Sequence, residues 1–88
     1  MKLLINITLK EGVLDPQGLA IKNSLSTLGF ENINTVKQGK IIEIDIFESD
    51  IKNAEAQASL MCEKLLANIV IEDYSIKVIG KSAWEPQL

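Results

Sequence analysis

The side chains that most often carry out chemistry in proteins are scarce in this chain. Its 88 residues include no histidine, no arginine and a single cysteine, Cys62. Composition therefore excludes a histidine general base, a Cys–His nucleophile pair, a disulfide within the chain and a cysteine–histidine zinc site. The missing arginine also removes the usual bidentate phosphate ligand, which argues against an acylphosphatase-like enzyme.

The remaining candidates each have a simple structural explanation. Cys62 shares an apolar helical stripe with Ala58 and Leu65, which favours a small core residue over a nucleophile. Glu72 and Asp73 are adjacent carboxylates before a predicted strand, and without a third ligand such a pair is more typical of a solvated loop than of a magnesium or acid/base site. We therefore predict no catalytic, cofactor-binding or metal-binding residue in this chain.

The charge balance narrows the classes of partner. Nine lysines against 12 acidic residues give a net charge of −3, which disfavours nucleic acid. Phe47 is the only aromatic residue of the predicted central strands, so a surface for stacking RNA bases is also missing. No apolar run approaches the roughly 20 residues that span a bilayer, so no membrane contact is expected. A lone cysteine and an N-terminus without a signal-peptide pattern predict a cytoplasmic protein.

The first half of the chain has the periodicity of a strand followed by a helix. Residues 2–10 alternate between apolar and polar side chains, as in a half-buried strand. A helix is expected to begin at Pro16, because Asp15 can accept hydrogen bonds from first-turn amides and a proline at the first helical position loses no needed donor. Gly29 is the expected stop of this helix.

The second half predicts two strands, a helix and a final strand. Residues 31–38 have a weak strand pattern, and a turn at Gln38-Gly39 leads to a clear strand over residues 40–48. A helix capped by Ser49 or Asp50 then ends near Asn68, which we expect in the left-handed conformation. Residues 74–78 alternate as the last strand.

This order predicts an α+β fold. The sequence strand, helix, strand, strand, helix, strand folds with right-handed crossovers into a ferredoxin-like sandwich: a four-stranded antiparallel sheet with both helices on one face. Residues 1–80 form one domain, and residues 81–88 are expected to be a mobile tail. The uncovered sheet face carries Leu4, Ile41 and Phe47, which are candidates for self-association.

Three separated motifs resemble one family. They are Val13-Leu14-Asp15-Pro16-Gln17-Gly18, Val36-Lys37-Gln38-Gly39-Lys40, and Met61-Cys62-Glu63-Lys64-Leu65-Leu66-Ala67-Asn68 running into Val70-Ile71-Glu72-Asp73-Tyr74. In order and spacing they are similar to PurS, the small subunit of phosphoribosylformylglycinamidine synthase. Ile69 and Lys37 stand where this family commonly has Thr and Arg, and the tail around Trp84 follows no family pattern.

The resemblance implies a role in a carbon–nitrogen ligase complex at the fourth step of purine synthesis. Such a complex uses ATP, magnesium and glutamine to convert formylglycinamide ribonucleotide into formylglycinamidine ribonucleotide. A glutaminase subunit releases ammonia and a large synthetase subunit activates the amide oxygen. The PurS-type chain, a homodimer or dimer of dimers, joins them, is noncatalytic, binds none of these cofactors and can aid ammonia transfer.

The family motifs supply the candidate contact or structural residues. These are Asp15, Pro16, Gln17, Gly18, Gly39, Lys40, Glu72, Asp73 and Tyr74. One alternative from another class stays open: an ACT-like regulatory domain has the same order of elements and binds a small molecule, such as an amino acid, between chains.

Overall fold

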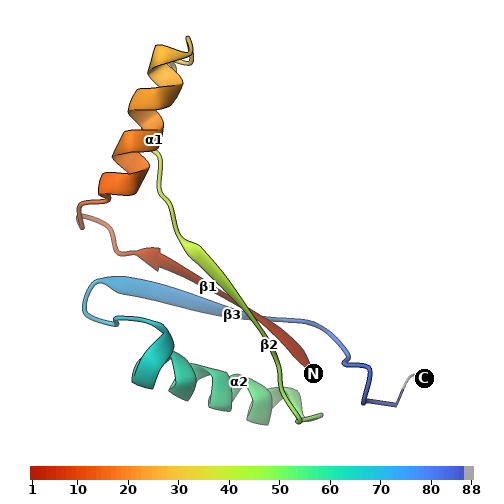
Figure 1. The fold of residues 1–88 in the computed structure, drawn as a ribbon. Coiled ribbons are helices and arrows are strands. Elements are labelled where there is room, and N and C mark those ends of the chain that lie inside the picture. Colours follow the sequence, from red (N-terminus) through yellow and green to blue (C-terminus); the bar gives the residue numbers. More distant parts are fainter. Residues whose placement is uncertain (87–88) are drawn as a thin grey trace.

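The computed structural model describes residues 1–86, which form a three-stranded antiparallel sheet, two α-helices and a short π-helix (Figure 1). β1 (Lys2–Leu9) is the central strand, with β2 (Lys40–Asp45) on one side and β3 (Glu72–Gly80) on the other. The register places Ile5 opposite both Ile42 and Ile76. The predicted α+β class and the pairing of β2 with β1 are confirmed.

The core lies between the sheet and α2 (Ile51–Met61), where the alternation of β1 places every second side chain under the helix. The smallest helix residues, Ala54 and Ala58, are the ones that face the strands, so α2 lies close to the sheet. A single π-helical turn, η1 (Cys62–Leu66), continues α2 and adds Cys62 to the core. The fully buried strand side chains are Leu3, Ile5 and Ile7.

The prediction that both helices cover one sheet face is wrong. α1 (Pro16–Thr27) projects away from the sheet as an arm (Figure 1), and the molecule measures 50 × 30 × 15 Å. Gly18 is the only buried residue of α1, while Leu19 and Leu28 are 50% and 72% exposed. The reason is local: the arm packs along residues 33–38 instead of crossing back over the strands.

The predicted strand at residues 31–38 is also absent from the structure, so the sheet has three strands and not four. With Ile33 and Val36 as its only branched apolar residues, this segment offers a sheet little to bury. It runs beside α1, where the Lys22 ammonium donates to the Asn34 carbonyl over 2.7 Å. The hairpin expected at Gln38-Gly39 therefore does not form.

Most other boundaries agree with the sequence. Asp50 caps α2 by accepting from the amide of Asn53 at 3.1 Å, as predicted. Asn68 is not left-handed, since every positive φ among the described residues belongs to glycine. Instead the Asn68 side chain accepts from the amide of Val70 at 3.1 Å, which turns the chain into β3.

Residues 81–86 run back beside the N-terminus, and the last two residues of the predicted tail lie outside the described chain. Their predicted mobility stays a prediction. Within residues 1–86, every helix is too short or too polar to cross a membrane.

Candidate functional site

Two of the three motifs meet the end of β1 through backbone contacts. In the antiparallel pair of β1 and β3, Leu9 lies opposite Glu72, and the next residue, Lys10, donates its amide to the carbonyl of Ile71 over 2.8 Å. From the other side, a Cβ on Gly39 would lie 2.5 Å from the carbonyl oxygen of Ile7. Glycine therefore lets the second motif press directly against β1.

Asp15 connects the first motif to the second. One of its carboxylate oxygens accepts from the amide of Gly18 at 2.8 Å, which caps α1 as predicted. The other oxygen accepts from the amide of Gln38 at 2.9 Å, and the sequence did not predict this contact. The hydrogen bonds from Gln38 and then Gly18 hold the pKa of the Asp15 carboxyl below its ordinary value, because both favour the charged form.

Gly18 lets the arm and the neighbouring segment approach closely. A Cβ at this position would collide with the carbonyl oxygen of Val36 and lie 2.8 Å from Oδ2 of Asp15. We call residues 8–18, 34–40 and 70–73 the joint, because these segments connect the α1 arm to the sheet. All three family motifs contribute to the joint.

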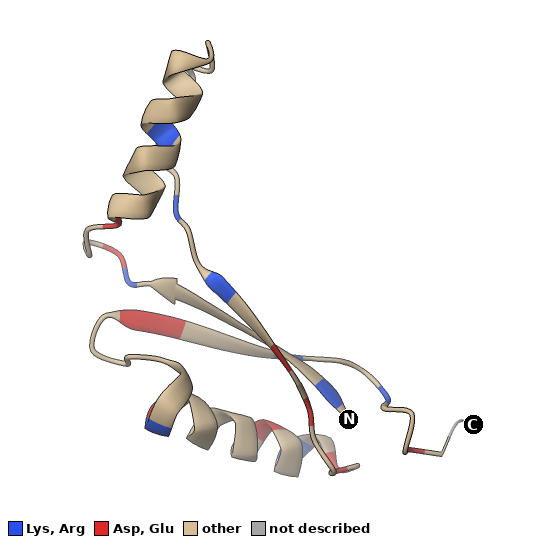
Figure 2. Ribbon diagram, viewed as in Figure 1, with Lys and Arg blue, Asp and Glu red and all other residues tan. Residues whose placement is uncertain are grey.

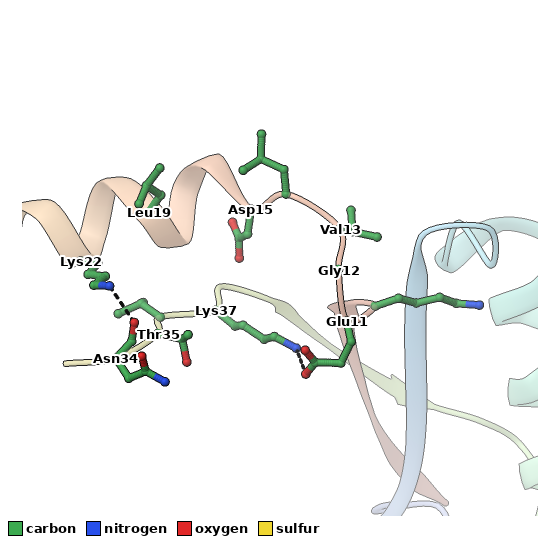
Figure 3. Close-up of a pocket in the computed structure, with 12 residues that line it drawn as sticks. Glu11, Gly12, Val13, Asp15, Leu19, Lys22, Asn34, Thr35 and Lys37 are labelled. Atoms are coloured by element: carbon green, nitrogen blue, oxygen red, sulfur yellow. Dashed lines mark hydrogen bonds and ion pairs between the residues drawn. The ribbon is translucent and has the colours of Figure 1, made fainter.

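A groove of about 410 Å³ lies in the joint, between α1 and residues 34–37 (Figure 3). Across it the Lys37 ammonium and the Glu11 carboxylate point toward one another at 2.6 Å. This pair lowers the pKa of Glu11, but Glu11 is 92% exposed, so water and salt screen the attraction. The groove is lined by residues 10–15, Leu19, Lys22 and residues 34–37.

The joint contains the parts of a mechanical connection and no set of reacting groups. Groups of three or more metal-ligating side chains are absent from residues 1–86. Cys62 is fully buried in the core, away from the joint, and burial raises the pKa of its thiol, which makes it a poor nucleophile. The joint can fix the direction of the arm and present the surfaces around it.

The remaining motif residues divide between surface and structure. Pro16 and Gln17 are exposed at the start of α1, and Lys40 is exposed where β2 begins. Asp73 is exposed on β3, whereas the hydroxyl of Tyr74 hydrogen-bonds with the Ser59 hydroxyl of α2 at 2.9 Å. Tyr74 therefore helps to hold α2 on the sheet.

Glu72 differs from the solvated carboxylate that the sequence suggested. Its side chain accepts from the amide of Asn68 at 2.7 Å and so closes the loop before β3. Sequence reasoning could have found this bond only from the spacing of Asn68 and Glu72, four residues apart.

The three self-association candidates do not form one patch. Leu4 is half-buried opposite Glu43, and Ile41 is exposed opposite Asn6. Phe47 follows the end of β2, where its ring centroid is 5.5 Å from that of Trp84.

The family model described as PurS, phosphoribosylformylglycinamidine (FGAM) synthase, matches residues 2–80. The chain belongs to the PurS family. A relative from Bacillus subtilis, phosphoribosylformylglycinamidine synthase subunit PurS, is 43% identical over 77 residues, which cover 88% of this chain and 90% of the relative. The PurS motifs that meet in the joint all lie within the matched residues.

Solved PurS structures share the fold. The crystal structure of Methanocaldococcus jannaschii PurS, one of the subunits of formylglycinamide ribonucleotide amidotransferase, has a TM-score of 0.77 at 45% identity, covering 86% of this chain and 92% of that chain. A chain in the structure of PurLQS from Thermotoga maritima has a TM-score of 0.78 at 26% identity, covering 86% and 93% of the two chains. The arm and the three-stranded sheet are thus described in a chain whose fold recurs across this family.

Proposed function

We propose that this chain is the noncatalytic PurS subunit of a cytoplasmic phosphoribosylformylglycinamidine synthase, in which it joins the glutaminase and synthetase subunits. The complex would use ATP, magnesium and glutamine in the fourth step of purine synthesis, with none of them bound by this chain. The relatives support the complex, since they are named as subunits of that synthase or as PurLQS. The lack of any reacting constellation in the joint supports the noncatalytic role.

The observation that carries the bridging role is the convergence of the three motifs on the joint. Asp15, Gly18 and Gly39 have specific structural tasks there, because each makes or permits a close contact between segments. Gln17 and Asp73 lie at the surface of the same region without a comparable task in the fold. We assign such exposed motif residues to contact with the larger subunits.

The arm supports self-association as a homodimer or a dimer of dimers. Lys22 is the only charged residue of α1, so the helix is almost uniformly uncharged in Figure 2. A solvated helix usually carries charge on its outer face, whereas this one exposes Leu19 and Leu28. β2 is an edge of the sheet, and the exposed Ile41 and Phe47 lie along or just beyond it, which adds a second surface for another chain.

A dimer offers two copies of the joint. We propose that each copy holds a glutaminase subunit beside a synthetase subunit, so that ammonia passes between them without loss to water. In this role the chain aligns its partners and takes no part in making or breaking bonds.

Co-purification of the chain with both larger subunits tests the proposal. We expect one complex that contains all three chains, and a dimer or tetramer of the 9.7 kDa chain in sedimentation of the isolated protein. A monomer that binds neither larger subunit would overturn it. Tight binding of an amino acid by that monomer would instead favour an ACT-like regulator.

A further inference from the structure

The N-terminal amino group of the chain lies in a site that residues 81–86 complete. The Met1 ammonium donates to the Ile46 carbonyl at 2.8 Å and to the Ser82 hydroxyl at 2.7 Å. It also forms an ion pair with Glu85, at 2.5 Å from Oε1. A primary ammonium has three N–H donors, so these three acceptors satisfy it completely.

The acceptors are themselves held in place. The Ser82 hydroxyl, which accepts from the ammonium, donates in turn to Oδ1 of Asp45, and the Asp45 carboxylate stands 3.7 Å from the Met1 nitrogen. The amide of Ser82 donates to Oε1 of Glu85 at 2.9 Å. Lys2 is the other cation whose charge acts on Asp45. The site thus has a built network of carboxylates, a hydroxyl and a carbonyl around one positive charge.

Burial makes this arrangement depend on its cation. Met1 is 5% exposed, Ser82 is 0% exposed and Glu85 is 6% exposed, which is unusual for a carboxylate near the end of a chain. A buried carboxylate is stable when it is paired and costly when it is not. Glu85 would therefore leave this position if the Met1 nitrogen lost its charge.

We propose that residues 81–86 form a latch that closes on the free α-ammonium of Met1 and opens when that amine is acylated. An N-formyl or N-acetyl group removes the positive charge and two of the three donors, so Glu85 and Ser82 lose the group that they bind. The opened latch withdraws Trp84 from Phe47 and uncovers the end of β2. The state of the N-terminus then controls the exposure of an apolar edge of the sheet.

The latch lies outside the region that defines the family. The family model ends at residue 80, and the latch residues follow it. Its failure would leave the proposed synthase role untouched, because none of the joint residues takes part in it.

Trp84 provides the test, since it is the only tryptophan of the chain and its indole N–H lies 3.4 Å from Oδ1 of Asp45. The full 88-residue chain can be made by chemical synthesis with ligation at Cys62, once with a free Met1 amine and once with an Nα-acetyl group. A third synthesis with Nε-acetyl-Lys52 removes one positive charge from exposed α2 and serves as the control. Circular dichroism establishes that all three chains are folded.

We expect Nα-acetylation to increase the quenching of Trp84 by acrylamide toward that of a free tryptophan peptide, while acetyl-Lys52 matches the unmodified chain. Glu85→Gln with a free amine should change quenching in the same direction, and Glu63→Gln, on η1, should not. Equal quenching in the free and Nα-acetylated chains would overturn the proposal. If Nα-acetylation prevents folding, the comparison of Glu85→Gln with Glu63→Gln decides it: equal quenching of Trp84 refutes the latch.

Discussion

Replacing Gly18 with alanine perturbs the joint at its tightest point. The added methyl group would overlap the carbonyl oxygen of Val36 and approach Oδ2 of Asp15 to 2.8 Å. Neither neighbour can move freely, because Asp15 also accepts from the amide of Gln38 at 2.9 Å. The clash is therefore relieved by moving residues 34–38 away from α1.

The size of the effect follows from two opposing contributions. Overpacking of this kind costs about 1–3 kcal/mol, and the greater helix propensity of alanine returns up to about 1 kcal/mol. The net loss is then roughly 0–2 kcal/mol. Since α1 lies outside the core, we expect this loss at the joint and not in the unfolding of the sheet and α2.

Hydrogen exchange measures this directly. In Gly18→Ala, the amide of Gln38 should lose protection, while the amides of β1 keep theirs and co-purification with the larger subunits falls. Gln17→Ala changes the neighbouring exposed residue and serves as the control, with Gln38 protected as in the parent chain. Unchanged protection of Gln38 and unchanged assembly in Gly18→Ala would refute the idea that this contact directs the arm.

Further predictions concern the core, the surface of the joint and its pH dependence. Cys62→Ala should destabilise the chain by about 1 kcal/mol or less in urea unfolding and leave the activity of the complex unchanged, since a thiol is little larger than a methyl group; a loss of turnover in an intact complex would contradict the noncatalytic role. Asp73→Ala should lower glutamine-dependent turnover and spare the reaction with free ammonia, whereas Lys77→Ala, farther along β3, should do neither; equal effects of the two substitutions would count against a contact at Asp73. Because the pKa of Asp15 is lowered, its contribution to the joint is complete above the ordinary value of 3.8 and is lost as the pH falls through the lowered pKa. The amide resonance of Gln38, followed by NMR, should shift only below pH 3.8, and a shift near neutral pH would be inconsistent with this assignment.

The elements that the sequence predicted well are those with a strong local signal. Alternating apolar residues identify β1, and Asp15 with Pro16 marks the start of α1, because caps and periodicity act within a few residues of the chain. The family motifs likewise located the residues of the joint. These signals describe each segment without stating where it goes.

The errors arose where the path of the chain depends on distant contacts. Residues 31–38 pack beside α1 and form no strand, because Asp15 and Gly18 engage this segment through Gln38 and Val36. Periodicity within the segment carries no trace of that contact. The pairing of Met1 with Glu85 was missed for the same reason, since it joins the two ends of the described chain.

The measurement that tests the central claim most directly is turnover of the reconstituted synthase with two nitrogen sources, with and without this chain. The synthetase and glutaminase subunits are combined with formylglycinamide ribonucleotide, ATP and magnesium, and either glutamine or an ammonium salt is supplied. We predict that omitting the chain abolishes the glutamine-dependent reaction and leaves the ammonia-dependent reaction of the synthetase subunit in place. Loss of both reactions would place the chain in the chemistry, and loss of neither would show that it does not join the two subunits.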